Sequence, residues 1–369
     1  MINGRLKKVF PGGNTSRGFH SFYDYIIDSD ATRIFVIKGG PGVGKSTFMR
    51  KIGEAMLERG YDAEFHCCSS DNGSLDGLVI PAIRVALLDG TAPHVVDPKN
   101  PGAVDEIIHL GDHWNAKGLV KNKKEILDAN REVGRLFRRA YGYLASAKIF
   151  LDQVESYYQD TRALDVGALD KLCLDLTHEI FEGRDRQTEK PRARHLFITA
   201  ITPDGSVSHL DTVADRLSRK FIISGDDGTG KTTLVKRLMD SAMMRGFNVE
   251  AYHCALSPGN IDHLVIPALD TAVINSVEPH FYRPREGDRV IDTMHFVNPV
   301  LNTQYLAEKT TAREMYRRSM ELAVDFIAKA KAEHDHMETF YVPFMNFDEI
   351  NTRREDTLAR ILELAEEYK

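Results

Sequence analysis

The stretch Gly39-Gly-Pro-Gly-Val-Gly-Lys-Ser46, called the first loop, is highly informative about the fold, because it joins a short apolar run to an amphipathic segment through a glycine-rich turn. A second loop, Gly225-Asp-Asp-Gly-Thr-Gly-Lys-Thr232, has the same G-x-x-x-x-G-K-S/T pattern. Lys45 and Lys231 lie 231 − 45 = 186 positions apart, about half of the 369 residues. One unit of sequence therefore occurs twice in the chain.

Further matches outside the loops keep nearly the same spacing. The run Leu75-Asp-Gly-Leu-Val-Ile-Pro-Ala-Ile83 parallels Ile261-Asp-His-Leu-Val-Ile-Pro-Ala-Leu269, so the chain is a tandem duplication. A charged stretch without large apolar residues, 182–192, separates the copies and predicts an exposed linker. The other matches pair Glu64-Phe-His-Cys67 with Ala251-Tyr-His-Cys254, Ala92-Pro-His94 with Glu278-Pro-His280, and Leu136-Phe-Arg-Arg139 with Met315-Tyr-Arg-Arg318.

A boundary near residue 190 divides the chain into two predicted domains of the same organisation, 1–190 and 191–369. In each, a β-rich apolar run ends at the loop, an amphipathic helix follows, and further strands come next. This order predicts an α/β fold with two tandem domains, each a parallel sheet covered by helices on both faces. The expected strands are 34–37, 63–67, 85–89, 221–223 and 249–254, and the expected helices are 46–59 and 232–245.

The second part of each domain is long, charged and periodically apolar, over 122–160 and 301–337. Apolar residues at helical spacing are typical of helices that pack along one face. We therefore expect a helical hairpin appended to each sheet. The expected stripes are Leu136, Ala140, Tyr141 and Leu144 in the first segment and Tyr316, Met320 and Ala323 in the second.

The two loops have the composition of a phosphate-binding turn. A helix that begins at such a loop presents unpaired N–H groups to an anion, and glycine lets the backbone wrap closely round it. In this pattern the lysine reaches the outer phosphates and the Ser or Thr hydroxyl binds Mg²⁺. The expected nucleotide-binding residues are Gly39, Gly40, Pro41, Gly42, Val43, Gly44, Lys45, Ser46 and Thr47, with Gly225, Asp226, Asp227, Gly228, Thr229, Gly230, Lys231, Thr232 and Thr233.

Both halves resemble P-loop NTPases, and the run from Leu78-Val-Ile-Pro-Ala-Ile83 through Leu87-Leu-Asp-Gly-Thr-Ala-Pro-His94 is similar to an uncharacterised family of bacterial tandem P-loop ATP-binding proteins. The resemblance implies ATP and Mg²⁺ as cofactors, and it places Asp89 where the magnesium-binding Walker B aspartate stands. The alternative is that Asp89 only opens a turn with Gly90. The resulting catalytic set is Lys45, Asp89 and Lys231, and the metal set is Ser46, Asp89 and Thr232.

The two halves differ in charge at corresponding positions. Asn275 stands where the first half has Asp89, and an amide lacks the charge that Mg²⁺ prefers. Asp226 and Asp227 lie within the second loop and should repel a polyphosphate unless a metal or substrate compensates. The second loop is nonetheless similar to that of thymidylate-kinase-like proteins, which implies substrate positioning by Asp227 as an alternative.

Neither half places a water-activating glutamate after the Walker B position, because Gly90 and Ser276 stand there. This absence predicts slow hydrolysis or a base from elsewhere. The arginine pairs 138–139 and 317–318 lie on the long helical segments, either as a solvated face or as a lid or arginine finger.

Polar residues near the second strands admit both structural and functional interpretations. His66-Cys-Cys68 and His253-Cys254 end these strands, where packing, substrate contact and a shared metal site are the alternatives. Asp76 and Asp262 are expected at helix N-termini, with contact to the nucleotide site as the second interpretation.

Composition limits the classes of function. Lys and Arg total 48 against 54 Asp and Glu, a net charge of −6, which disfavours a dedicated nucleic-acid binder. Four scattered cysteines and the absence of a bilayer-length apolar run indicate a cytoplasmic protein with no membrane contact.

We expect an ATP-binding intrachain pseudo-dimer that hydrolyses ATP slowly to move its helices, with the first repeat catalytic and the second regulatory. The alternatives are a phosphotransferase acting on a nucleotide or other small molecule, and a non-hydrolysing adaptor that binds a partner in one nucleotide state.

Overall fold

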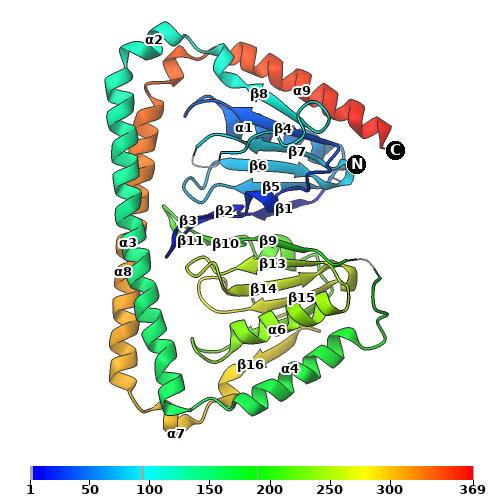
Figure 1. Ribbon diagram of the computed structural model, residues 1–369, viewed down its shortest axis with the longest axis vertical. Helices are drawn as coiled ribbons and strands as arrows, with labels where there is room; N and C mark the ends of the chain where they lie inside the picture. Colours follow the sequence, from blue (N-terminus) through cyan, green and yellow to red (C-terminus); the bar gives the residue numbers. More distant parts are fainter. Residues whose placement is uncertain (1–2, 93–94, 189, 369) are drawn as a thin grey trace.

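The computed structural model describes residues 3–92, 95–188 and 190–368, and each repeat folds around its own six-stranded sheet. The two sheets lie edge to edge, and a pair of long helices runs along both of them (Figure 1). An α/β fold with two mostly parallel sheets is therefore confirmed. Pro93 and His94, which belong to one of the matches between the repeats, lie outside the described residues.

The first sheet has the strand order β1-β5-β6-β7-β4-β8. Next to the edge strand, β4 (Arg33–Lys38) is an apolar run that lies between the parallel strands β7 (Val85–Asp89) and β8 (Asp105–His109). One strand, β6 (Leu75–Ile80), runs antiparallel to both of its neighbours. The remaining strands are β1 (Leu6–Val9) and β5 (Ala63–Cys67).

The second sheet repeats this plan in the order β16-β12-β15-β14-β13-β9, with β14 (Ile261–Ile266) as the antiparallel strand. The antiparallel strand in each sheet corrects the wholly parallel sheets expected from the sequence. Short turns connect it to the strands on either side, and only antiparallel strands are joined by short turns. The other strands are β9 (Ala193–Leu196), β12 (Arg219–Ser224), β13 (Val249–His253), β15 (Thr271–Asn275) and β16 (Arg289–Asp292).

Each loop opens a helix that packs on its sheet. These helices, α1 (Lys45–Glu58) and α6 (Lys231–Met244), begin at the loop lysines, as the apolar spacing predicts. On the opposite face of the first sheet, Ile26 of an irregular segment clusters with Ile34 and Val36 of β4. Irregular chain therefore replaces the second helical layer that was expected there.

The long helices of the two repeats pack against each other instead of folding back as hairpins within each repeat. These helices, α3 (Lys123–Thr161) and α8 (Leu306–Glu338), form an antiparallel pair that we call the helical rod (Figure 1). At 1.5 Å per residue, the 39 residues of α3 extend over about 58 Å, enough to pass from one sheet to the other. The rod buries Ala140, Leu144, Ala147, Ala323 and Ile327.

Each repeat also gives its last helix to the other. The first repeat's α4 (Val166–Phe181) packs on α6, and the second repeat's α9 (Phe347–Glu367) packs on α1. Residues 182–188 and 190, between the repeats, are exposed, and the helical layer of each sheet is completed by chain from beyond them. Single antiparallel bridges at the two crossings pair Trp114 with Met345 and Leu164 with Val297.

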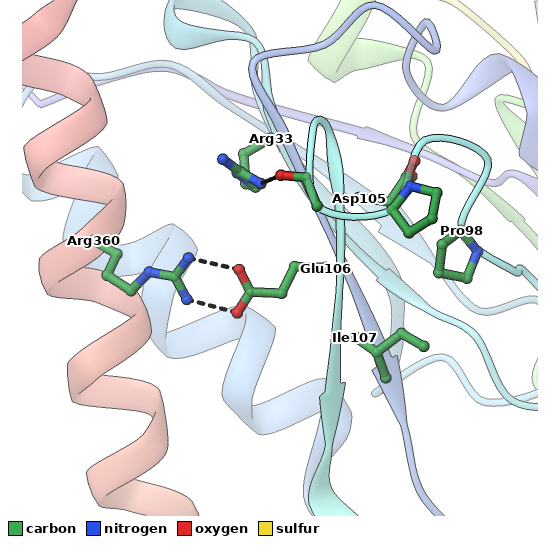
Figure 2. A pocket seen from close by; sticks show the side chains of 8 residues that line it. Arg33, Pro98, Asp105, Glu106, Ile107 and Arg360 are labelled. Carbon is green, nitrogen blue, oxygen red and sulfur yellow. Dashed lines mark hydrogen bonds and ion pairs between the residues drawn. The ribbon is translucent and has the colours of Figure 1, made fainter.

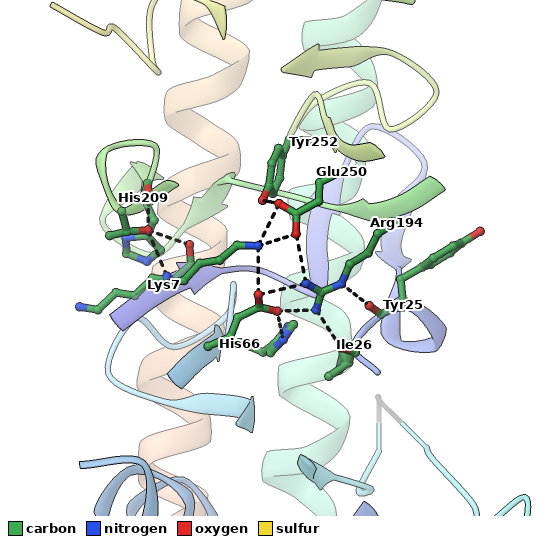
Figure 3. Close-up of polar contacts among 11 residues, drawn as sticks. Lys7, Tyr25, Ile26, His66, Arg194, His209, Glu250 and Tyr252 are labelled. Atoms are coloured by element: carbon green, nitrogen blue, oxygen red, sulfur yellow. Dashed lines mark hydrogen bonds and ion pairs between the residues drawn. The ribbon is translucent and has the colours of Figure 1, made fainter. Parts of the chain in front are cut away.

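The sheets meet where the edge strands β1 and β9 lie side by side, and a buried ionic cluster joins them (Figure 3). Lys7 Nζ lies 3.0 Å from a carboxylate oxygen of Glu64 and 2.8 Å from one of Glu250. Arg194 contacts the same two carboxylates. Strand register pairs Lys7 with Glu64 in one repeat and Arg194 with Glu250 in the other, so the two repeats contribute corresponding pairs of residues to the joint.

Two small hairpins support the middle of the rod. The hydroxyl of Tyr141 on α3 donates to Asn14 Oδ1 at 3.2 Å, which ties the rod to the first hairpin. The hairpin strands are β2 (Gly12–Thr15) with β3 (Gly18–Ser21) and β10 (Thr199–Thr202) with β11 (Gly205–Ser208). The short helices are α2 (Ala116–Lys121), α5 (Asp211–Ala214) and α7 (Pro299–Asn302).

Candidate functional site

Both loops adopt a backbone that requires glycine. Gly42 and Gly44 of the first loop have φ values of 67° and 86°, and Gly228 and Gly230 of the second have 83° and 86°. A helix begins directly after each loop, so the N–H groups of its first turn are available at the loop. Each loop thus lies at the carboxyl end of a parallel strand, where α/β sheets bind their ligands.

Lys45 turns back across the first loop. Its Nζ donates to the backbone oxygens of Gly39 at 3.2 Å and Gly40 at 2.8 Å, and it lies 3.6 Å from Oδ2 of Asp89. Asp89 ends β7 and accepts from the N–H of Thr91 at 2.8 Å. Burial raises the pKa of Asp89, and the charge of Lys45 acts against this shift. Asp89 therefore shapes the turn after β7 and also faces the loop lysine.

Asp76 also lies at the first loop. It is in β6 and not at a helix N-terminus, so that expectation is wrong. The register of β6 with β7 sets Asp76 beside Asp89, because an antiparallel strand begins at the edge where its parallel neighbours end. Burial raises the pKa of Asp76 to about 6, although its hydrogen bonds and the charge of Lys45 act in the opposite direction. Two carboxylates therefore lie near one lysine.

The donor set at the first loop fits Mg²⁺, which takes oxygen ligands and is commonly held by one or two carboxylates together with substrate phosphates. Asp89 supplies the carboxylate that faces the loop. Ser46 is the second residue of α1, directly after Lys45, and its Oγ accepts from the N–H of Leu75 at 3.0 Å. The Ser46 hydroxyl and Asp89 are thus the groups that would hold the ion.

The second loop keeps the lysine and changes its surroundings. Lys231 Nζ donates to two loop carbonyl oxygens at 2.9 and 2.6 Å, and burial lowers its pKa. Asn275 ends β15 at the place where Asp89 ends β7. Asp262 lies in β14, not at a helix N-terminus, and burial raises its pKa to about 6. An amide in place of the facing carboxylate makes this donor set a poorer fit for Mg²⁺.

The acidic second loop is partly neutralised by the helical rod. Asp226 Oδ2 accepts from Arg313 of α8 at 2.9 Å and from the hydroxyl of Tyr158 of α3 at 3.0 Å. The sequence analysis did not single out Arg313. The available signal was its position one helical turn before Arg317. The arginines that were considered for a finger or lid, Arg138, Arg139, Arg317 and Arg318, are all exposed on the rod.

The histidines and cysteines that end the second strands are packed into the protein. His66 Nε2 lies 2.8 Å from Glu64, and His253 Nε2 lies 2.8 Å from Nδ1 of His195. Burial raises the pKa of the Cys254 thiol. In the described ranges 3–92, 95–188 and 190–368, no group of three or more His, Cys, Asp and Glu side chains is arranged to hold a metal. Packing and hydrogen bonding are the interpretations that these contacts favour.

The ends of the rod cover both loops, and at each loop a covering helix comes from the other repeat. The N–H of Gly42 donates to Oε1 of Glu338 on α8 at 3.0 Å. A Cβ on Gly228 would lie 2.9 Å from the ring of Tyr158 and 3.1 Å from Cα of Glu155, both on α3. Each loop is therefore shared between the repeats, which the sequence of one repeat alone does not indicate.

A surface pocket of about 520 Å³ lies away from both loops, between β8 and α9 (Figure 2). The guanidinium of Arg360 binds both carboxylate oxygens of Glu106 there, at 2.6 Å each. This ion pair fastens α9 to the edge of the first sheet. We interpret the pocket as part of the seam at which the exchanged helix docks.

A scan of protein-family models found no match to the chain, and searches of curated proteins and of solved structures also found none. The helices within the described part of the chain include none that is long and apolar enough to cross a membrane.

Proposed function

We propose that the protein is a tandem P-loop ATP-binding protein that hydrolyses ATP slowly with Mg²⁺, and that nucleotide state moves its helical rod. The observation that carries this proposal is the first loop: Lys45 crosses it and lies 3.6 Å from Asp89, at the N-terminus of α1. A lysine, a helix N-terminus and a carboxylate at one strand end form a set suited to a polyphosphate with its metal ion.

The first repeat is the catalytic one in this proposal. When bound, Mg²⁺ would neutralise charge that develops on the transferred phosphoryl group. Lys45 would bind the phosphate oxygens, while Asp89 and Ser46 would hold the ion. No glutamate follows Asp89, so Asp76 is the second carboxylate at this edge of the sheet. The second repeat, with Asn275 in place of the aspartate, would bind nucleotide in a regulatory role.

One observation favours a second candidate, a phosphotransferase acting on a nucleotide or other small molecule. Arg313 is held at the second loop by Asp226, within reach of a site at which arginine could stabilise a transferred phosphoryl group. ATP consumption that is accelerated by one metabolite and yields a phosphorylated product would support this candidate. No acceleration across a broad panel of metabolites would count against it.

The four cysteines are all free, which supports a cytoplasmic site of action.

The proposed function is tested by measuring Mg²⁺-dependent ATP turnover for the wild-type chain and for Lys45→Ala and Lys231→Ala. We expect Lys45→Ala to abolish turnover, because it removes the ammonium group at the catalytic loop, and Lys231→Ala to change only its regulation. Loss of turnover in Lys231→Ala with none in Lys45→Ala would contradict the assignment of roles. Absence of both ATP binding and turnover in the wild-type chain would contradict the function itself.

A further inference from the structure

The first loop already binds an anionic group, and this group is a side chain of the protein itself. The backbone N–H of Gly42 donates to Oε1 of Glu338 at 3.0 Å. Glu338 is the last residue of α8, which the second repeat contributes. The side chains of Glu338 and of Val342, which follows α8, lie close to the loop, because a Cβ on Gly42 would lie 3.2 Å from Cβ of Glu338 and 3.1 Å from Cγ2 of Val342.

A carboxylate and a phosphate compete for such a donor. The loop amides are the groups that a glycine-rich loop offers to phosphate oxygens, and one N–H makes one strong hydrogen bond. A glutamate left beside a bound polyphosphate would also add repulsion between like charges. A nucleotide that enters the first loop must therefore displace Glu338.

We propose that Glu338 is a latch that holds the end of α8 on the first loop, and that a nucleoside triphosphate opens this latch by taking the N–H of Gly42. This inference rests on the proposed function, since it requires the first loop to bind phosphate. Opening releases α8 from the loop while the middle of the rod stays packed on the hairpins. The nucleotide site of one repeat thereby controls the attachment of a helix from the other.

The second loop is closed in a different way, which makes the latch a property of the first. There the carboxylate of Asp226 belongs to the loop itself and is bound by Arg313 of α8. The rod thus brings the carboxylate of Glu338 to an amide of the first loop, and it brings the guanidinium of Arg313, together with Glu155, to the second. Phosphate would compete with the rod at the first loop and would find an attracting group at the second.

The latch is tested on the full-length protein in a Lys231→Ala background, so that binding reports on the first loop. The ligand is a non-hydrolysable ATP analogue with Mg²⁺, titrated by calorimetry. We expect Glu338→Ala to lower Kd about tenfold, which corresponds to about 1.4 kcal/mol, because the competing anion is gone. Glu338→Gln should give an intermediate shift, since it keeps an acceptor and loses the charge.

Asp335→Ala is the matched control, because Asp335 is an exposed carboxylate on the same turn of α8 and bonds Lys331 instead of the loop. It should leave Kd unchanged. Normal binding with no tightening in Glu338→Ala, or equal tightening in Asp335→Ala, would overturn the latch and leave the proposed function standing. No binding in any variant would overturn the proposed function together with the latch.

Hydrogen exchange gives a second readout that does not depend on affinity. Loading the first loop with the analogue should speed amide exchange in the peptide 334–346, because the end of α8 is released. Slower exchange there on loading would overturn the latch. Reduced ATP turnover in Glu338→Gln at unchanged Kd would also overturn it, because Glu338 would then act on the bound nucleotide instead of competing with it.

Discussion

The two loops have nearly the same backbone and opposite electrostatic surroundings. Gly44 and Gly230, which precede the loop helices, both have φ of 86°, and both lysines turn back to loop carbonyl oxygens. At the first loop the lysine faces Asp89, and Glu338 binds a loop amide. At the second, the strand ends in Asn275 and an arginine partly neutralises the loop by binding Asp226.

This comparison shows that loop geometry and loop chemistry are set by different residues. Glycines and an apolar strand are enough to build the turn and start the helix. Side chains from neighbouring strands and from the rod then decide whether the turn holds a metal-bound phosphate, a carboxylate or an arginine. Duplicated units can therefore keep one shape while they come to do unequal work.

The two repeats also contribute unequally to the ionic cluster, and this difference predicts the largest effect on stability. Glu64 is contacted by Lys7, Arg194 and His66, and its side chain is 5% exposed, against 19% for Glu250. Glu64→Gln should lower the free energy of unfolding by about 3 kcal/mol, because it leaves the two buried cations Lys7 and Arg194 to share the single carboxylate of Glu250. Urea unfolding measures this, and Glu250→Gln should cost less. An equal or larger loss in Glu250→Gln would show that the joint is symmetric in energy.

Exchanging the strand-end residues tests the chemical difference between the loops. Asp89→Asn copies the second repeat into the first, and it should reduce Mg²⁺-dependent ATP turnover at least about 100-fold, or about 2.7 kcal/mol in activation free energy. Binding of ATP without metal should persist. The reciprocal change Asn275→Asp should give the second loop Mg²⁺-dependent binding. Full turnover in Asp89→Asn would remove the basis for calling the first repeat catalytic.

Acid should weaken the fold through buried neutral histidines near the second loop. Burial lowers the pKa of His280 to about 4, whereas its ordinary value is 6.5. The unfolded chain therefore binds the proton first as the pH falls, and unfolding free energy drops between about pH 6.5 and 4, by up to about 1.4 kcal/mol per pH unit for one such group. His280→Gln should flatten the slope in denaturant titrations at several pH values. The exposed His295, changed in the same way, should leave it unaltered.

The smallest expected effect concerns the arginine at the second loop. Arg313→Gln leaves the Asp226 carboxylate without its cation, so a polyphosphate meets more repulsion there. In a Lys45→Ala background, the Kd of a non-hydrolysable ATP analogue should rise about fivefold, or about 1 kcal/mol. Arg317→Gln, on the exposed side of the same helix, should change nothing. An unchanged Kd in Arg313→Gln would separate Arg313 from nucleotide binding.

Local patterns predicted the elements that bear the loops, because strand and helix formation there depends on residues close in sequence. The strand before Gly39 and the helix after it follow from apolar spacing and from the glycines. The linker near residue 190 follows from its charge. These features need no partner from the rest of the chain.

The contacts that distinguish the two loops involve residues that are distant in sequence, so local patterns could not predict them. An apolar stripe on α3 shows that the helix has a partner, but it does not show that the partner is α8 of the other repeat. Asp76 was expected at a helix N-terminus, but it lies in β6, a strand whose direction is set by pairing with β5 and β7. Glu338 reaches the first loop only through the exchange of helices, and Arg313 reaches the loop of its own repeat from a residue 87 positions away.

The number of nucleotide sites and their need for metal distinguish the two loops by experiment. Calorimetric titration of the wild-type chain with a non-hydrolysable ATP analogue should give two sites, of which only one tightens on addition of Mg²⁺. Lys45→Ala should remove the Mg²⁺-dependent site, and Lys231→Ala should remove the other. No binding, or two sites that respond equally to Mg²⁺, would contradict the account.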